Sequence, residues 1–104
     1  HNVSMLVGSK PGDSFSFKFT GRAVGIFTAA GPDAGTIQYS IDGGEWREQD
    51  LFTKWSRGLH IPWVYILANE LEPAEHVIRI EIGEKKNKAS KGTSCRIVNL
   101  LINE

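Results

Sequence analysis

The sequence predicts an all-β domain, an antiparallel β-sandwich, and three observations carry this prediction. Apolar and polar residues alternate with a period of two in several segments, and helical periodicity is almost absent. Glycine and proline interrupt the chain at intervals of about ten residues, as turns between short strands do. Alternation with a period of two buries one face of a strand, and strands spaced in this way are typical of a sandwich or barrel.

The first two predicted strands flank Gly21. Phe15, Phe17 and Phe19 alternate with polar residues, which places three aromatic rings on one face of a strand. Val24 and Ile26 continue in a second strand. Gly25 lies inside that strand and therefore indicates a bulge or a close approach of another backbone.

A hairpin is predicted where a third strand meets Asp42-Gly43-Gly44. Ile37, Tyr39 and Ile41 alternate in this strand, and glycine adopts the positive φ of a tight turn at little cost. Trp46 is expected in the return strand. Between the second and third strands, the range 31–35 (Gly-Pro-Asp-Ala-Gly) predicts a turn.

The C-terminal half continues the pattern. Ile78, Ile80 and Ile82 are expected to share a face with His76, and the range 95–102 is apolar on both faces. That range is typical of a central strand or of one covered by a neighbouring domain. The range 68–72 has room for a single helical turn, and 85–91, with four lysines, is expected to be a solvated hairpin tip.

Composition narrows the functional classes. Leu, Ile, Val and Phe make up 28 of the 104 residues, enough for a folded core. Twelve basic residues balance twelve acidic ones, whereas a nucleic-acid-binding protein usually has a basic excess. The longest apolar runs are far shorter than the roughly 20 residues of a membrane span. Cys95 is the only cysteine, and we expect a buried, inert thiol.

The sequence predicts neither a catalytic site nor a metal site. Gly12-Asp13-Ser14 resembles the motif around the nucleophile of GDSL esterases, whose base lies three residues after an aspartate. Here Pro73 precedes His76 and Arg57 precedes His60 at that spacing, so Ser14 is expected to be an outward-facing strand residue. No His, Cys, Asp or Glu spacing is typical of a metal site. A structural calcium held by loop carbonyls and Asp33 or Asp42 stays an open alternative.

The range 50–63 is the richest in candidate binding residues. A sugar presents flat C–H faces and hydroxyl groups, which suit an aromatic platform beside planar polar groups. Trp55 would stack on the ring, and the polar residues would bind hydroxyls. The alternative is that both tryptophans of this range plug the ends of the sandwich; Trp63 shares a face with Ile61 and Tyr65, which favours burial. The candidate carbohydrate-binding residues are Asp50, Trp55, Arg57, His60 and Trp63.

Several motifs in order carry a resemblance to a known domain family. The ranges are 19–27 (FTGRAVGIF), 31–35 (GPDAG), 39–44 (YSIDGG), 50–55 (DLFTKW) and 59–63 (LHIPW). They resemble the jelly-roll domain attached to SGNH/GDSL-type hydrolases of bacteria. More loosely, the chain is similar to the β-sandwich domain of family 2 carbohydrate esterases. The range 71–80 matches the close of such sandwiches, with an alanine near position 74 in place of the usual glycine.

The resemblance implies a galactose-binding-like jelly roll in which residues 1–104 form one non-catalytic accessory domain excised from a larger hydrolase. It implies a glycan ligand, a fused esterase domain as partner, and a secreted or periplasmic location; the residues themselves predict no cofactor, apart from the calcium alternative above. Two functions stay open. The domain binds carbohydrate or positions substrate for the esterase, or it is a structural docking and spacing element that packs against its own catalytic domain.

Overall fold

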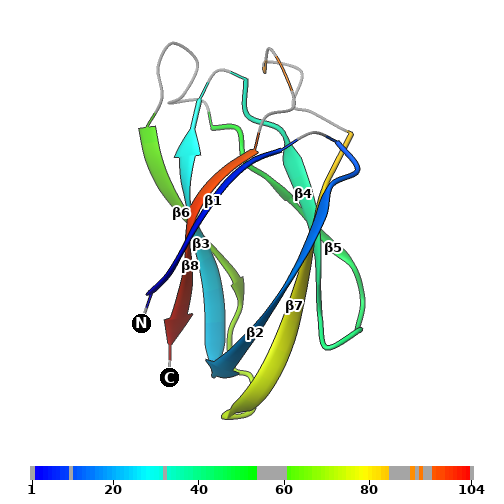
Figure 1. Cartoon of the computed structure of the whole chain (residues 1–104), viewed down its shortest axis with the longest axis vertical. Helices are drawn as coiled ribbons and strands as arrows, with labels where there is room; N and C mark the ends of the chain where they lie inside the picture. Colours follow the sequence, from blue (N-terminus) through cyan, green and yellow to red (C-terminus); the bar gives the residue numbers. More distant parts are fainter. Residues whose placement is uncertain are drawn as a thin grey trace.

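The chain folds into a sandwich of two four-stranded antiparallel sheets (Figure 1). The computed structural model describes residues 2–9, 11–31, 33–53, 61–84, 90, 92 and 95–103. The described residues contain eight strands and no helix. These strands are β1 (Asn2–Ser9), β2 (Ser14–Gly21), β3 (Ala23–Ala30), β4 (Thr36–Ile41), β5 (Arg47–Asp50), β6 (Ile61–Ala68), β7 (Ala74–Ile82) and β8 (Cys95–Asn103).

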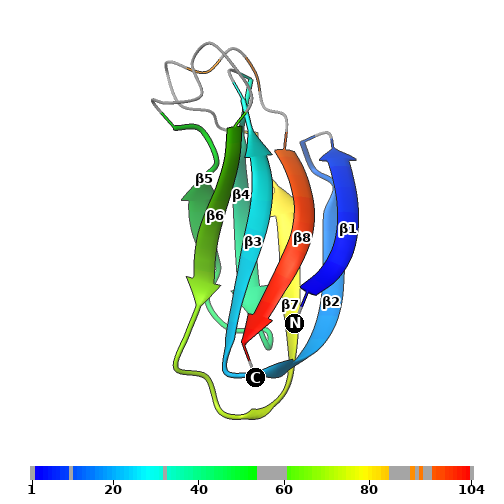
Figure 2. The same cartoon turned by 90° about the vertical axis from the view of Figure 1, so that its left-hand side faces the viewer.

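The strand order is that of a jelly roll. The first sheet has the order β1-β8-β3-β6 and the second β2-β7-β4-β5, so successive strands cross between sheets except at the β4–β5 hairpin. The edge strands β5 and β6 consequently lie on the same long side of the sandwich, and β1 and β2 lie on the other (Figure 2). No backbone ladder joins β5 to β6, which leaves that side of the sandwich free to form a groove.

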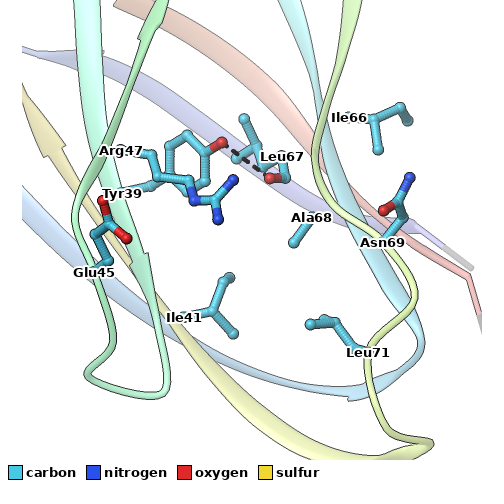
Figure 3. A pocket seen from close by; sticks show the side chains of 9 residues that line it. All are labelled: Tyr39, Ile41, Glu45, Arg47, Ile66, Leu67, Ala68, Asn69 and Leu71. Atoms are coloured by element: carbon cyan, nitrogen blue, oxygen red, sulfur yellow. Dashed lines mark hydrogen bonds between the residues drawn. The ribbon is translucent and has the colours of Figure 1, made fainter.

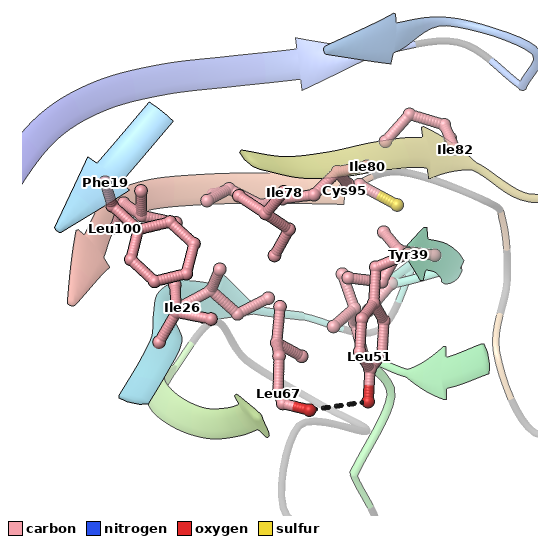
Figure 4. Packing of buried hydrophobic residues seen from close by; sticks show 14 of the residues in the cluster. Phe19, Ile26, Tyr39, Leu51, Leu67, Ile78, Ile80, Ile82, Cys95 and Leu100 are labelled. Carbon is pink, nitrogen blue, oxygen red and sulfur yellow. Dashed lines mark hydrogen bonds between the residues drawn. The ribbon is translucent and has the colours of Figure 1, made fainter. Parts of the chain in front are cut away.

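The core lies between the two sheets, as the alternation predicts (Figure 4). Phe15, Phe17 and Phe19 lie on the inward face of β2, with Phe19 the most buried of the three. The inward residues of β4 and β7 pack against those of β3 and β8. Fully buried members of the core are Val24, Ile26, Ile37, Leu51, Ile78, Ile80, Ile82, Cys95, Ile97 and Leu100.

Gly25 is both a bulge site and a point of close approach, as predicted. The register of β3 against β6 shifts between Val24 and Gly25. A Cβ atom at Gly25 would lie 2.6 Å from the Tyr65 carbonyl oxygen, closer than real Cβ contacts. Glycine therefore allows β6 to lie close against β3 at this position.

The predicted hairpin is a type I′ turn. Asp42 and Gly43 have φ values of 53° and 71°, and the Gly44 N–H donates to the Ile41 carbonyl at 2.9 Å. The return strand begins later than predicted: β5 starts at Arg47, and Trp46 precedes it. The β4–β5 ladder pairs Tyr39 with Arg47, one residue beyond the register that the turn alone would set.

Other predictions have mixed outcomes. β8 lies between β1 and β3, which confirms the central-strand interpretation, and Cys95 is buried. The Ala34 N–H donates to the Gly31 carbonyl, a turn as predicted. The helical turn at 68–72 is wrong: β6 ends at Ala68, and Glu70 has a φ of 55°, outside the right-handed helical region. In the predicted hairpin tip, only Ser90 lies within the described residues.

Candidate functional site

A groove of about 380 Å³ opens between the two edge strands, on the side where β5 and β6 lie (Figure 3). One wall comes from β4 and the start of β5, and the other from the end of β6 and the connection to β7. The lining residues are Tyr39, Ile41, Glu45, Arg47, Ile66, Leu67, Ala68, Asn69 and Leu71. Ile41, Ala68 and Leu71 make its floor apolar, whereas Glu45, Arg47 and Asn69 supply polar groups.

The hairpin register determines which side chains form the first wall. Arg47 is directly opposite Tyr39, and cross-strand partners point to the same face of a sheet. Tyr39 and Arg47 therefore both point toward the groove (Figure 3). The Ser40 hydroxyl donates to the Gly44 carbonyl at 2.9 Å, which holds the turn against the end of β4.

The second wall is irregular backbone anchored to the body of the sandwich. The Leu71 N–H donates to the Arg22 carbonyl at 2.9 Å, which ties the β6–β7 connection to the bend between β2 and β3. Asn69 is exposed on this connection, and Leu71 is half-buried against the core. Asn69 therefore faces the groove from the side opposite Glu45 and Arg47 (Figure 3).

A neutral hydrogen bond links the two walls at their inner end. The Tyr39 hydroxyl donates to the Leu67 carbonyl at 2.9 Å, and this contact is buried (Figure 3). The bond joins β4 of one sheet to β6 of the other, so it crosses the sandwich. We call it the tyrosine tie.

A second, charged contact links the same two walls at their outer end. His76 Nδ1 lies 2.6 Å from Asp42 Oδ2, and His76 Nε2 lies 2.7 Å from the Glu72 carbonyl oxygen. The Asp42 carboxylate also accepts the Val77 N–H at 2.8 Å. We call this cluster the histidine tie. Asp42 follows Ile41 and Glu72 follows Leu71, so each end of the tie adjoins a lining residue of the groove.

Each partner in the histidine tie stabilises the charge of the other. The hydrogen bond to Asp42 raises the pKa of His76 above its ordinary value, and the Glu72 carbonyl adds to that effect. The hydrogen bonds from His76 and the Val77 N–H lower the pKa of Asp42. His76 was predicted on the buried face with Ile78, and the structure confirms this with a side chain of 8% exposure.

The groove has the chemical character of a site that binds rather than reacts. Glu45, Arg47 and Asn69 are planar groups that donate or accept hydrogen bonds, and apolar carbon lies beneath them. Within the described ranges, neither the Glu45 nor the Arg47 side chain is engaged in a hydrogen bond or ion pair. Both groups are therefore available to a ligand with hydroxyl groups.

Asp50 and Trp63, two of the sequence-predicted binding residues, do not line the groove. Trp55, Arg57 and His60 fall outside the described residues. Asp50 is half-buried at the end of β5, and its Oδ1 accepts the Phe52 N–H at 2.9 Å, a local turn contact. Trp63 is half-buried on the inward face of β6, and its carbonyl accepts the Thr28 hydroxyl at 3.1 Å. In these contacts Asp50 and Trp63 serve the fold.

Tyr65, on the inward face of β6, is an unusual buried phenol. Burial, assisted by the negative charge of Asp50, raises the pKa of Tyr65 to about 12. Among the described residues, its hydroxyl oxygen is buried with no hydrogen-bond partner.

The described part of the chain offers neither a metal site nor a helical membrane span. No group of three or more His, Cys, Asp or Glu side chains there could hold a metal ion. Asp42, one of the residues considered for calcium, binds His76 and Val77. No helix in these residues is long and apolar enough to cross a bilayer.

Sequence reasoning did not identify the groove residues. Tyr39 was recognised only as a core residue, and Glu45, Arg47 and Asn69 carry no motif. The available signal was the cluster of charged residues around Trp46 directly after a predicted turn. β5 and β6 are edge strands of different sheets and share no ladder, so no strand-pairing pattern in the sequence indicates that the hairpin lies beside residues 66–71. That arrangement follows from the strand order of the two sheets.

Comparisons with known proteins agree on the fold. No family model matches the chain, and no curated protein matches it. A two-domain esterase (CEX) active on acetylated mannans, crystallised with mannopentaose, matches with a TM-score of 0.69 and 14% identity over 88% of this chain. The chain spans 25% of that esterase.

Two further structures extend the comparison. The family 35 carbohydrate-binding module from Clostridium thermocellum matches with a TM-score of 0.57 and 14% identity, covering 99% of this chain and 92% of the module. A Paenibacillus xanthan lyase matches with a TM-score of 0.57 and 17% identity, over 100% of this chain and 12% of the lyase. At these identities the likeness establishes a shared jelly-roll fold, which confirms the predicted fold class.

Proposed function

We propose that this chain is a non-catalytic carbohydrate-binding domain and that it holds a glycan in the groove between β5 and β6. One observation carries the proposal: the groove places planar polar side chains over an apolar floor. A pyranose ring has the matching surface, because its C–H faces need apolar contact and its hydroxyls need donors and acceptors. The fold that the chain shares with a carbohydrate-binding module supports this function.

The range 50–63 is a second proposed contact region for the same glycan. There Trp55 would stack on a sugar ring, Arg57, His60 and Asp50 would bind hydroxyls, and Trp63 would add a further aromatic contact. We further propose that the natural polypeptide continues into an SGNH-type esterase and is secreted or periplasmic. The likeness to part of a two-domain esterase supports that arrangement.

One NMR titration separates the two contact regions, because Asn69 lines the groove and Trp55 lies in the range 50–63. We expect mannopentaose, cellopentaose or xylopentaose to shift the side-chain amide of Asn69 in a ¹H–¹⁵N NMR titration. Single sites of this kind bind with a Kd of about 0.1–1 mM. A shift of the Trp55 indole alone would move the site to the second region.

Arg47 provides the matching variant. Arg47→Ala removes a planar donor from the groove, and we expect affinity for the bound glycan to fall about tenfold, as for loss of a hydrogen bond from a charged donor. Arg79→Ala is the control, because Arg79 is exposed on β7, outside the groove. The proposed function fails if none of the three glycans produces a saturable shift in the wild-type chain.

A docking role is the second candidate function. Val64 and Ile66 are 46% and 62% exposed and stand two residues apart on the edge strand β6, so they form a small apolar strip. A fused catalytic domain that packed on this strip would make the chain a spacing element with no ligand of its own. Limited proteolysis of the parent polypeptide tests this: a docked pair of domains resists cleavage between them, and Ile66→Asp would remove that resistance.

A further inference from the structure

His76 lies at the meeting point of the two groove walls and contacts both. Its Nδ1 contacts Asp42 of the β4–β5 turn, and its Nε2 contacts the carbonyl of Glu72 in the β6–β7 connection. These two segments carry Glu45 on one side and Asn69 on the other. One imidazole ring therefore links the two segments next to the lining residues Ile41 and Leu71.

The chemistry of the two partners requires a protonated ring. A carbonyl oxygen only accepts hydrogen bonds, and an ionised carboxylate also only accepts. Both His76 nitrogens must therefore donate, and this occurs only in the imidazolium form. When the ring loses a proton, one of its nitrogens presents a lone pair to an oxygen 2.6–2.7 Å away. Asp42 stays bound to Val77 through two hydrogen bonds that do not involve the ring, so the contact that becomes repulsive is the one between His76 Nε2 and the Glu72 carbonyl oxygen.

The charged groups around the His76 ring favour its protonated form. Among the described residues, Asp42 and Glu72 are the charged groups that act on it, and both favour its protonated form. The neighbour from β2 is the uncharged Phe19, whose ring centroid lies 5.5 Å from that of His76. Glu75 and Val77 precede and follow it on the exposed outer face of β7.

We propose that protonated His76 is a latch that sets the spacing of the two groove walls, so that raising the pH releases one wall and weakens glycan binding. The effect on binding rests on the proposed function of the groove, whereas the latch itself does not. The tyrosine tie keeps the inner end of the groove closed in both states, because it is a bond between neutral groups. The predicted motion is therefore an opening at the outer end.

The latch is tested first without any ligand. Backbone N–H residual dipolar couplings of residues 41–46 and 69–72 are measured at pH 5 and pH 9, with those of β3 and β8 as the fixed reference frame. We expect one of the two wall segments to reorient relative to that frame as His76 titrates. In His76→Asn the couplings should not change between the two pH values. Couplings of the wild-type walls that are the same at pH 5 and pH 9 would overturn the latch.

Two further variants separate the latch from a general effect of charge. Asp42→Asn keeps an acceptor for the Val77 N–H, and asparagine tolerates the positive φ of this position, but it removes the carboxylate partner. We expect the His76 titration and the wall movement to shift to lower pH together. Glu75→Gln removes an exposed carboxylate next to His76 on the other face of β7 and should titrate as the wild type does. A wall movement that does not follow the His76 midpoint would contradict the proposal.

Glycan affinity is measured last. We expect the Kd of the best-binding pentaose to rise about fivefold from pH 5 to pH 9, the lower end of ordinary coupling between sites. His76→Asn should abolish this dependence and Glu75→Gln should retain it. If no glycan binds at any pH, the proposed function fails, but the residual dipolar couplings still test whether His76 controls the position of the groove walls. If the walls move and the affinity does not, regulation of binding by His76 is wrong.

Discussion

The two ties across the groove join the same pair of walls by opposite chemistry. The tyrosine tie is a single buried hydrogen bond between a neutral hydroxyl and a carbonyl. The histidine tie is an ion pair that solvent reaches, since the Asp42 side chain is 47% exposed. A neutral buried bond contributes through the cost of leaving a polar group unpaired, whereas an exposed ion pair depends on pH and salt. We therefore expect the tyrosine tie to be independent of pH and salt, and the histidine tie to depend on both.

Removing the Leu67 side chain, whose backbone carbonyl takes part in the tyrosine tie, should have the largest effect on stability. Leu67 is 4% exposed, and its carbonyl accepts the Tyr39 hydroxyl. Leu67→Ala should lower the free energy of unfolding by about 2–5 kcal/mol, because a buried leucine is lost and a cavity remains. Urea denaturation measures this. The control is Ile66→Ala at the exposed neighbouring position, where a change within about 0.5 kcal/mol is expected. Equal losses in the two variants would contradict the assigned burial.

Removing only the hydroxyl should have an intermediate effect. Tyr39→Phe keeps the ring in the core and leaves the Leu67 carbonyl without its donor. We expect the free energy of unfolding to fall by about 1–3 kcal/mol, the cost of an unsatisfied buried polar group. Because the bond is between neutral groups, urea midpoints at pH 5 and pH 8 should shift by the same amount. A loss that differs between the two pH values would show that the two ties are not independent.

The faces of the strands could be predicted from sequence, but the groove could not. Ile78, Ile80 and His76 follow a period of two that depends only on local backbone geometry, and the structure has them on one face. The groove instead depends on which edge strands lie side by side, a result of the jelly-roll order. The same limit applies to His76: its face was predictable, but its partner Asp42 is 34 residues away and was recognisable only as a turn residue.

The register of the hairpin shows how one residue decides the character of the groove. The Gly44 N–H donates to the Ile41 carbonyl. If the ladder continued regularly from this bond, Tyr39 would pair with Trp46. The observed partner of Tyr39 is Arg47, so one extra residue is accommodated before β5. A shift of one residue exchanges the two faces of a strand. Arg47 therefore enters the groove, and the 44% exposed Trp46 does not line it.

Removing the charge of the histidine tie should have the smallest effect on stability, and that effect should depend on pH. The folded-state pKa of His76 is raised, so its stabilising contribution is complete below the ordinary value of 6.5 and is lost as the pH rises through the folded value. The pKa of Asp42 is lowered, so its contribution is present above 3.8 and is lost as the pH falls through the folded value. Asp42→Asn should therefore lower the urea midpoint at pH 5 and have progressively less effect toward pH 9.

The effect of Asp42→Asn on stability should also depend on salt. Because solvent reaches Asp42, the difference between wild type and Asp42→Asn at pH 5 should shrink as sodium chloride is raised, whereas the loss in Tyr39→Phe should not. Glu75→Gln serves as the control for removal of an exposed carboxylate and should change the midpoint little at either pH. An Asp42→Asn effect that persists undiminished at pH 9 would mean that the Asp42 carboxylate does not act through protonated His76. The outer end of the groove would then be held by a contact as independent of pH as the inner one.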